Sequence, residues 1–153
     1  MRKEKAVATL RPILLVEDNP ADVELTLAAL RKTKLANDII VARDGVEALD
    51  FIFSEGQHSN RDTGHPAVVL LDLKLPKVDG LEVLERVKRH PRLRAIPIVM
   101  LTSSREESDI VRSYQFGVNS FVVKPVEFNA FFKAIRDLGV FWAVLNEPPP
   151  GDI

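Results

Sequence analysis

The sequence predicts an α/β fold in which five parallel strands alternate with five helices. Short apolar runs recur along the chain, and segments with the period of a helix separate them. This alternation is typical of βα units that build a doubly wound parallel sheet. The chain has 153 residues, of which 46% are apolar, and this is enough to fill the core of one domain of ordinary size.

Five apolar runs mark the predicted strands. They cover residues 13–16, 39–42, 68–71, 98–101 and 121–123. Buried strands tolerate charged residues only at their ends, and each of these runs is apolar nearly throughout. We therefore expect all five strands to lie inside the protein, with helices covering them.

The helices are predicted from apolar residues at helical spacing and from capping signals. Asn19 is suited to cap the first helix, and Pro20 to occupy its first position. Pro91 ends the third helix, and Gly117 is the expected stop of a polar fourth helix over 105–116. The apolar positions of the first three helices are Val23, Leu27 and Leu30; Val46, Leu49, Ile52 and Phe53; and Leu81, Leu84 and Val87.

The last helix is predicted to begin near Glu127 and to be unusually apolar towards its end. Phe141 and Trp142 lie in these final turns, where apolar residues occur nearly all round the helix. A monomer would expose part of this surface to water at some cost. We therefore expect a homodimer, with Phe141 and Trp142 as candidate interface residues. One stripe of this helix is the expected core face and comprises Phe128, Phe131, Phe132, Ile135, Leu138, Trp142 and Leu145.

The predicted domain organisation is simple. Residues 1–11 form an N-terminal extension, 12–145 a single domain, and 146–153 a proline-rich extended tail. Within the domain, 54–65 is a polar segment rich in turn-forming residues, which predicts a surface loop.

Composition excludes several classes of protein. The formal net charge is −1, and no block of lysine or arginine provides a surface for nucleic acid or an anionic membrane. No apolar segment is long enough for a signal peptide or a membrane span. The chain has no cysteine, so disulfide and thiolate chemistry are excluded. We expect a cytoplasmic protein that binds neither nucleic acid nor membrane.

Four of the predicted strands end at residues that can carry chemistry. These residues are Glu17 and Asp18, Asp72, Thr102, and Lys124. Open parallel sheets bind ligands beyond the carboxyl ends of their strands, so these side chains are expected to meet at one edge. Carboxylates held close together need a cation, and oxygen ligands alone favour Mg²⁺. A lysine and a hydroxyl beside such an ion predict a site that holds a phosphoryl group.

These residues occur in strings that together identify a family. LLVEDNPAD, LLDLKLPKVDG, MLTSS and FVVKP make the sequence similar to response-regulator receiver domains of two-component signalling, over roughly residues 12–145. The resemblance implies a flavodoxin-like sheet of order 2-1-3-4-5 and a phosphoaspartate formed at Asp72 from a histidine kinase. It also implies that Mg²⁺ is bound by Glu17, Asp18, Asp72 and the backbone carbonyl of Lys74.

The resemblance also implies a switch. Thr102 would donate its hydroxyl to a phosphoryl oxygen, and Phe121 would turn inward into the space released. Lys74 stands two positions after Asp72, where receivers control how fast water removes the phosphoryl group. A long cation there could shield the acyl phosphate, and we hypothesise slow self-dephosphorylation. Such a protein catalyses only its own phosphorylation and dephosphorylation.

A narrower resemblance concerns the partner. The polar loop over 54–65 and the aromatic end GVFWAVL make the chain similar to stand-alone regulators that serve phytochrome-type histidine kinases. The expected partners are thus a kinase of this type, a second copy of the chain, and a downstream protein that the sequence does not specify.

Two alternatives use similar residues. A Mg²⁺-dependent phosphatase of the haloacid dehalogenase type also has an aspartate nucleophile at a strand end. It typically needs a second acid two residues later, where this chain has Lys74. A phosphate-independent interaction module would typically lack one of the acids or the lysine, and all are present here.

Overall fold

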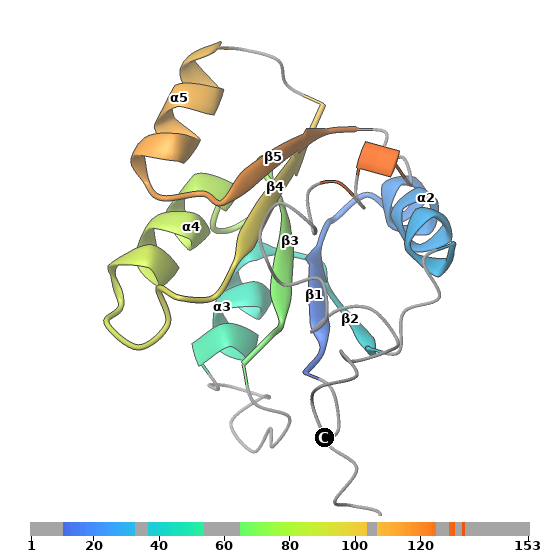
Figure 1. Ribbon diagram of the computed structural model, residues 1–153, viewed down its shortest axis with the longest axis horizontal. Helices are drawn as coiled ribbons and strands as arrows, with labels where there is room; N and C mark the ends of the chain where they lie inside the picture. Colours follow the sequence, from blue (N-terminus) through green and yellow to red (C-terminus); the bar gives the residue numbers. More distant parts are fainter. Residues whose placement is uncertain are drawn as a thin grey trace, which may run out of the picture.

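The computed structural model describes residues 11–32, 37–53, 65–103, 107–124, 129–130 and 133. Within them, five strands form one parallel sheet in the order β2-β1-β3-β4-β5, as Figure 1 shows. The strands are β1 (Ile13–Val16), β2 (Ile39–Ala42), β3 (Val68–Asp72), β4 (Ile98–Thr102) and β5 (Ser120–Val123). The predicted fold class and strand order are confirmed.

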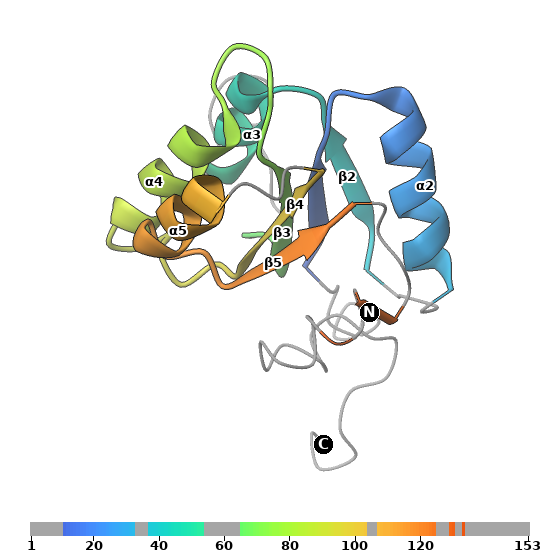
Figure 2. The ribbon, with the colours of Figure 1, turned by 90° about the horizontal axis from the view of Figure 1, so that it is seen from above.

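Four helices lie within the described residues. They are α2 (Pro20–Arg31), α3 (Gly45–Phe53), α4 (Gly80–Arg89) and α5 (Glu107–Gln115). Helices α3, α4 and α5 cover one face of the sheet and α2 covers the other, which Figure 2 shows from above. No helix in the described part of the chain is both long and apolar enough to cross a membrane.

The sheet separates two hydrophobic clusters because successive side chains of a strand point to opposite faces. In β1, Leu14 and Val16 join the cluster beneath α3 and α4. Ile13 and Leu15 join the cluster beneath α2, to which Val23 and other residues of that helix contribute. All four residues of β1 have no exposed surface, as expected for a central strand covered on both sides.

Local signals account for where the helices begin and end. The Asn19 side chain accepts a hydrogen bond from the N–H of Asp22, and Pro20 is the first residue of α2, as predicted. Asp79 caps α4 by accepting from the N–H of Glu82 at 3.0 Å. Gly117 follows α5 with a φ of 94°, a left-handed conformation that favours glycine.

The structure differs from the sequence-based expectations in a few places. The strands β3, β4 and β5 are each one residue longer than expected, because Asp72, Thr102 and Ser120 still pair in parallel register. Val46 is 41% exposed, since it lies on the side of α3 opposite the buried residues Phe51 and Ile52. The predicted last helix falls mostly outside the described residues, of which 129, 130 and 133 are helical.

Candidate functional site

The carboxyl ends of three strands bring the predicted acids and lysine together. Glu17 follows β1, Asp72 is the last residue of β3, and Lys124 follows β5. Because the order β1-β3-β4-β5 places these strands in one row, their ends share one edge of the sheet. Residues as far apart as 17 and 124 in the sequence therefore meet in one small volume.

Lys124 lies at the centre of the site. Its Nζ donates to Oε1 of Glu17 at 2.8 Å and to Oδ2 of Asp22 at 2.8 Å, and it lies 3.4 Å from Oδ2 of Asp72. The Lys124 side chain is only 11% exposed. Burial alone lowers the pKa of this lysine, but hydrogen bonds to Asp22 and Glu17 and the charge of Asp72 raise it well above its usual value. The ammonium group is therefore charged at neutral pH.

Asp72 is the carboxylate whose ionisation the site disfavours most clearly. Burial raises its pKa, the charge of Glu17 raises it further, and Lys124 only partly offsets them, so the pKa is about 7 instead of 3.8. The N–H of Lys74 donates to Oδ1 of Asp72 at 3.4 Å. At this edge the negative charge on Asp72 is costly unless a second cation or a proton neutralises it.

The acids have the arrangement of a divalent-cation site. Carboxylate oxygens from Glu17, Asp18 and Asp72 lie within 4.8 Å of one another. Glu17 and Asp72 are buried and Asp18 is exposed, so an ion bound here would keep contact with water. An all-oxygen donor set, beside an aspartate with a raised pKa, fits a hard cation such as Mg²⁺. The fourth predicted ligand, the Lys74 carbonyl, stays a prediction.

The backbone after Asp72 is held tightly by Gly80. A Cβ atom at position 80 would lie 2.2 Å from the Asp72 carbonyl oxygen and 2.9 Å from Cα of Leu73. The N–H of Gly80 donates to the carbonyl of Leu73 at 2.9 Å, which closes the loop between β3 and α4. Only glycine allows this approach, and it fixes the path of the chain as it leaves the site.

The structure describes the other predicted residues to different extents. Thr102 ends β4 and pairs in register with Val123, but its side chain lies outside the described residues. Phe121 is partly buried and packs against the cluster beneath α3 and α4. Phe141 and Trp142 lie outside the described residues, so their role at an interface stays a prediction.

Asp22 is the site residue that the sequence analysis missed. It lies in the first turn of α2, and its carboxylate is 33% exposed while it holds Lys124. Its signal was present in the sequence, since an acid in the first turn of a helix that starts beside a site is near that site and is favoured by the helix dipole. Asp22 lies within α2 and does not end a strand, so it is not among the charged residues at which the apolar runs stop.

Comparisons with known proteins agree with this geometry. The family model for the response regulator receiver domain matches residues 13–136. Response regulator Rcp1 of Synechocystis sp. is 39% identical over 130 residues, which cover 85% of this chain and 87% of Rcp1.

Solved structures give the same result. The bacteriophytochrome response regulator AtBRR has a TM-score of 0.82 and 73% identity, covering 90% of this chain and 99% of AtBRR. The Mn²⁺-bound form of Rcp1 has a TM-score of 0.72 and 38% identity, covering 87% of this chain and 94% of Rcp1. The chain is thus similar to response regulators over most of its length, and one of these structures carries a divalent cation.

Proposed function

Because this chain belongs to the response regulator receiver domain family, we propose that Asp72 accepts a phosphoryl group from the phosphohistidine of a histidine kinase. The observation that supports this most directly is the buried Asp72 carboxylate with the ammonium of Lys124 at 3.4 Å. Asp18 and Glu17 beside it complete a site for Mg²⁺. Residues of the same types at separate places in the fold would form neither a phosphoryl site nor a site for Mg²⁺.

The chemistry assigns each residue a role. One carboxylate oxygen of Asp72 attacks phosphorus, a P–O bond forms, the P–N bond to the kinase imidazole breaks, and the electron pair leaves with that imidazole. Glu17, Asp18, Asp72 and the Lys74 carbonyl would hold Mg²⁺, which would neutralise charge on the phosphoryl oxygens. Lys124 stabilises the same charge from the other side and then pairs with the product.

The proposed output begins at Thr102 and Phe121. The Thr102 hydroxyl donates to a phosphoryl oxygen and draws the end of β4 inward, and Phe121 fills the space that this movement leaves. Phe121 starts from a partly buried position against the core. Because it lacks the hydroxyl that a tyrosine would use, its inward state depends on packing alone. A Phe121→Ala variant that takes phosphate but changes its partner binding like the parent protein would contradict this switch.

The proposed partner is a phytochrome-type histidine kinase, supported by the similarity to a bacteriophytochrome response regulator at 73% identity. A homodimer and a downstream protein are the further partners that we propose, with Phe141 and Trp142 at the dimer interface. The absence of cysteine is in accord with a cytoplasmic location.

A mass measurement tests the central proposal. The protein is incubated with Mg²⁺ and acetyl phosphate, and we expect its intact mass to increase by one phosphoryl group. Asp72→Asn should show no increase, whereas Glu24→Gln, which removes an exposed acid of α2, should behave like the parent protein. A parent protein that stays unmodified, or an Asp72→Asn variant that is modified equally, would overturn the proposal.

The same preparation separates a receiver from a phosphatase. A receiver modifies itself once, whereas an enzyme of the haloacid dehalogenase type would hydrolyse p-nitrophenyl phosphate through many turnovers. The residue two positions after Asp72 is Lys74, so the second acid of such an enzyme is missing. Sustained release of p-nitrophenol that Asp72→Asn abolishes would favour the phosphatase.

A further inference from the structure

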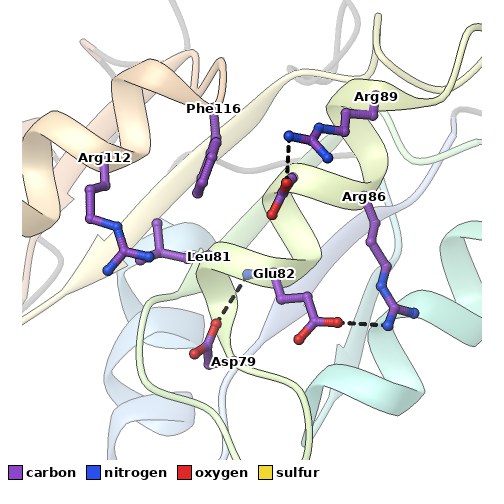
Figure 3. A pocket seen from close by; sticks show the side chains of 8 residues that line it. Asp79, Leu81, Glu82, Arg86, Arg89, Arg112 and Phe116 are labelled. Carbon is purple, nitrogen blue, oxygen red and sulfur yellow. Dashed lines mark hydrogen bonds and ion pairs between the residues drawn. The ribbon is translucent and has the colours of Figure 1, made fainter.

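A groove runs between α4 and α5, away from the site just described. One part of it is a cavity of about 450 Å³ between the two helices, shown in Figure 3. It continues into a second cavity of about 710 Å³ near the carboxyl ends of the same helices. Glu85, Arg89 and Phe116 line both cavities, so the two form one elongated groove.

The acids along this groove already have partners. Asp79 caps α4 through the N–H of Glu82, and Glu82 pairs with Arg86 at 2.6 Å. Glu85 pairs with Arg89 at 2.7 Å, and Figure 3 shows these contacts along α4. Glu82 and Glu85 are thus each paired with an arginine one turn further along α4, whereas Asp79 accepts a hydrogen bond from a backbone N–H and keeps its negative charge at the start of the groove.

Two arginines of the groove are open. Arg112 lines the first cavity and Arg94 the second, and both are exposed. Across the described part of the chain, neither guanidinium group makes a hydrogen bond or an ion pair. The remaining cation of the second cavity, Lys88, donates to two carbonyls and an amide oxygen. The groove therefore has an excess of positive charge, with one free arginine in each half.

Between these arginines the groove has an apolar surface. Phe116, the residue after α5, is partly buried and lies between the two helices in Figure 3. Leu81 lies close to Arg112 in the same view. A ligand that enters the groove can thus bury an apolar side chain on Phe116 while its charged groups face the arginines.

We propose that the groove between α4 and α5 is a docking surface for an acidic segment of a partner protein. Carboxylates of the segment pair with Arg112 and Arg94, because guanidinium groups bind carboxylates through two parallel hydrogen bonds. An apolar side chain between those carboxylates packs on Phe116. This surface gives the receiver a second place to make contacts, apart from the cluster of acids around Lys124.

Charge and shape favour such a segment over other ligands. The chain has a formal net charge of −1, so it provides no extended positive surface for the many phosphates of a nucleic acid. A single small anion would reach only one of the two open arginines, since they line different halves of the groove. An extended peptide reaches both and also uses the apolar surface between them.

A fluorescence anisotropy titration tests the proposal. The probe is a short labelled peptide in which glutamates flank a Leu-Phe pair, and its control carries glutamine in place of glutamate. We expect the parent protein to bind the acidic peptide at least about fivefold more tightly than the control peptide at low salt. Arg112→Glu and Arg94→Glu should each weaken binding of the acidic peptide by about fivefold or more.

Arg92→Glu is the matched control, because Arg92 is exposed in the same loop as Arg94 but lines a different cavity. It should bind the acidic peptide within about twofold of the parent protein. Phosphorylation by acetyl phosphate should be equal in all three variants, which shows that they are folded.

Three results would overturn the proposal. They are equal binding of the two peptides, an equal loss of binding in Arg92→Glu, or no saturable binding of the acidic peptide. Sedimentation of the same samples tests whether a second copy of the chain occupies the groove instead. Self-association that Arg112→Glu abolishes would assign the groove to that second copy.

Discussion

One ammonium group, that of Lys124 at the end of β5, contacts three carboxylates. Lys124 contacts Glu17, Asp22 and Asp72, so these four groups have a net charge of −2 when all are ionised, and Asp18 beside them adds further negative charge. Burial and the negative charge of Glu17 together raise the pKa of Asp72. The site is therefore prepared for a further cation, and its unliganded form is held under electrostatic repulsion.

Asp72→Asn should stabilise the metal-free protein at high pH. The pKa of Asp72 is about 7 in the folded protein and 3.8 in the reference state, so its ionisation opposes folding above pH 7. The gain in the free energy of unfolding should be on the order of 2 kcal/mol at pH 8 and should disappear as the pH falls towards 4. Urea denaturation at a series of pH values measures it.

Magnesium gives the complementary result in that experiment. Added Mg²⁺ should stabilise the parent protein at pH 8 much more than Asp72→Asn, because the ion neutralises the charge that the variant lacks. Stabilisation of both proteins by the same amount would show that the acids at this edge do not bind the ion.

Lys74→Ala should shorten the lifetime of the phosphorylated protein. The Lys74 side chain is exposed, two residues beyond Asp72, where it can cover the approach of water to the acyl phosphate. We expect hydrolysis to become a few-fold faster, on the order of 1 kcal/mol in activation free energy. Phosphate release followed after removal of acetyl phosphate measures the rate, and Lys77→Ala is an exposed control in the same loop. Unchanged lifetimes would refute the shielding hypothesis.

At the residue scale, sequence reasoning predicted most of the residues that meet around Lys124. Glu17, Asp72 and Lys124 could be predicted because a charge that stops an apolar run marks the end of a buried strand, and the carboxyl ends of parallel strands share one edge. Asp22 could not be found in this way, since its position depends on how α2 leaves β1. The side-chain arrangement around Lys124 required the three-dimensional structure.

A second lysine, Lys88, connects several elements at the edge of the sheet opposite the site. Lys88 of α4 donates to the carbonyls of Arg94 and Ile96 at 3.0 and 2.7 Å and to Oδ1 of Asn119 at 2.9 Å. The same Oδ1 accepts from the N–H of Ile98 at 2.8 Å. One side chain thus connects α4 with the starts of β4 and β5.

Lys88→Met should therefore destabilise the fold. The substitution keeps the apolar stem but leaves two carbonyls and an amide oxygen without their donor, which costs about 2 kcal/mol in the free energy of unfolding. Arg89→Met is the matched control and should change stability by less than about 0.5 kcal/mol, because the Arg89 side chain is 75% exposed and its ion pair with Glu85 is screened by water. Thermal denaturation monitored by circular dichroism compares them, and equal effects would contradict the role given to Lys88.

The limits of sequence reasoning at this scale are physical. Apolar runs predict β1 and β2 with their observed bounds, because each run stops where a charged residue follows, at Glu17 and at Arg43. The end of β3 is harder to predict, since Asp72 continues the ladder although it is charged. The groove between α4 and α5 could not be predicted at all, because it depends on how two polar helix surfaces face each other.

The whole molecule has two cores, and the sheet keeps them apart. One lies beneath α3 and α4, and the other beneath α2. The acids and Lys124 lie at the carboxyl ends of the strands, at the edge of the sheet that separates these two cores. The proposed groove belongs to the α4 and α5 side.

The oligomeric state is the prediction at this scale. If Phe141 and Trp142 form an interface, the parent protein should be a dimer at about 50 µM by multi-angle light scattering, and Trp142→Glu should be a monomer. The physical reason is that an apolar helix end gains stability when a second copy covers it. A parent protein that stays monomeric with and without phosphorylation would refute this prediction.

The place of β1 between β2 and β3 also affects the order in which the chain can assemble. Strand β1 pairs with β2 and with the more distant β3, so the site acids meet only when a contact between remote segments forms. Such contacts are the slow ones in folding. Repulsion between Glu17 and Asp72 opposes this same step. We therefore expect magnesium to speed refolding, which stopped-flow fluorescence with and without the ion would measure.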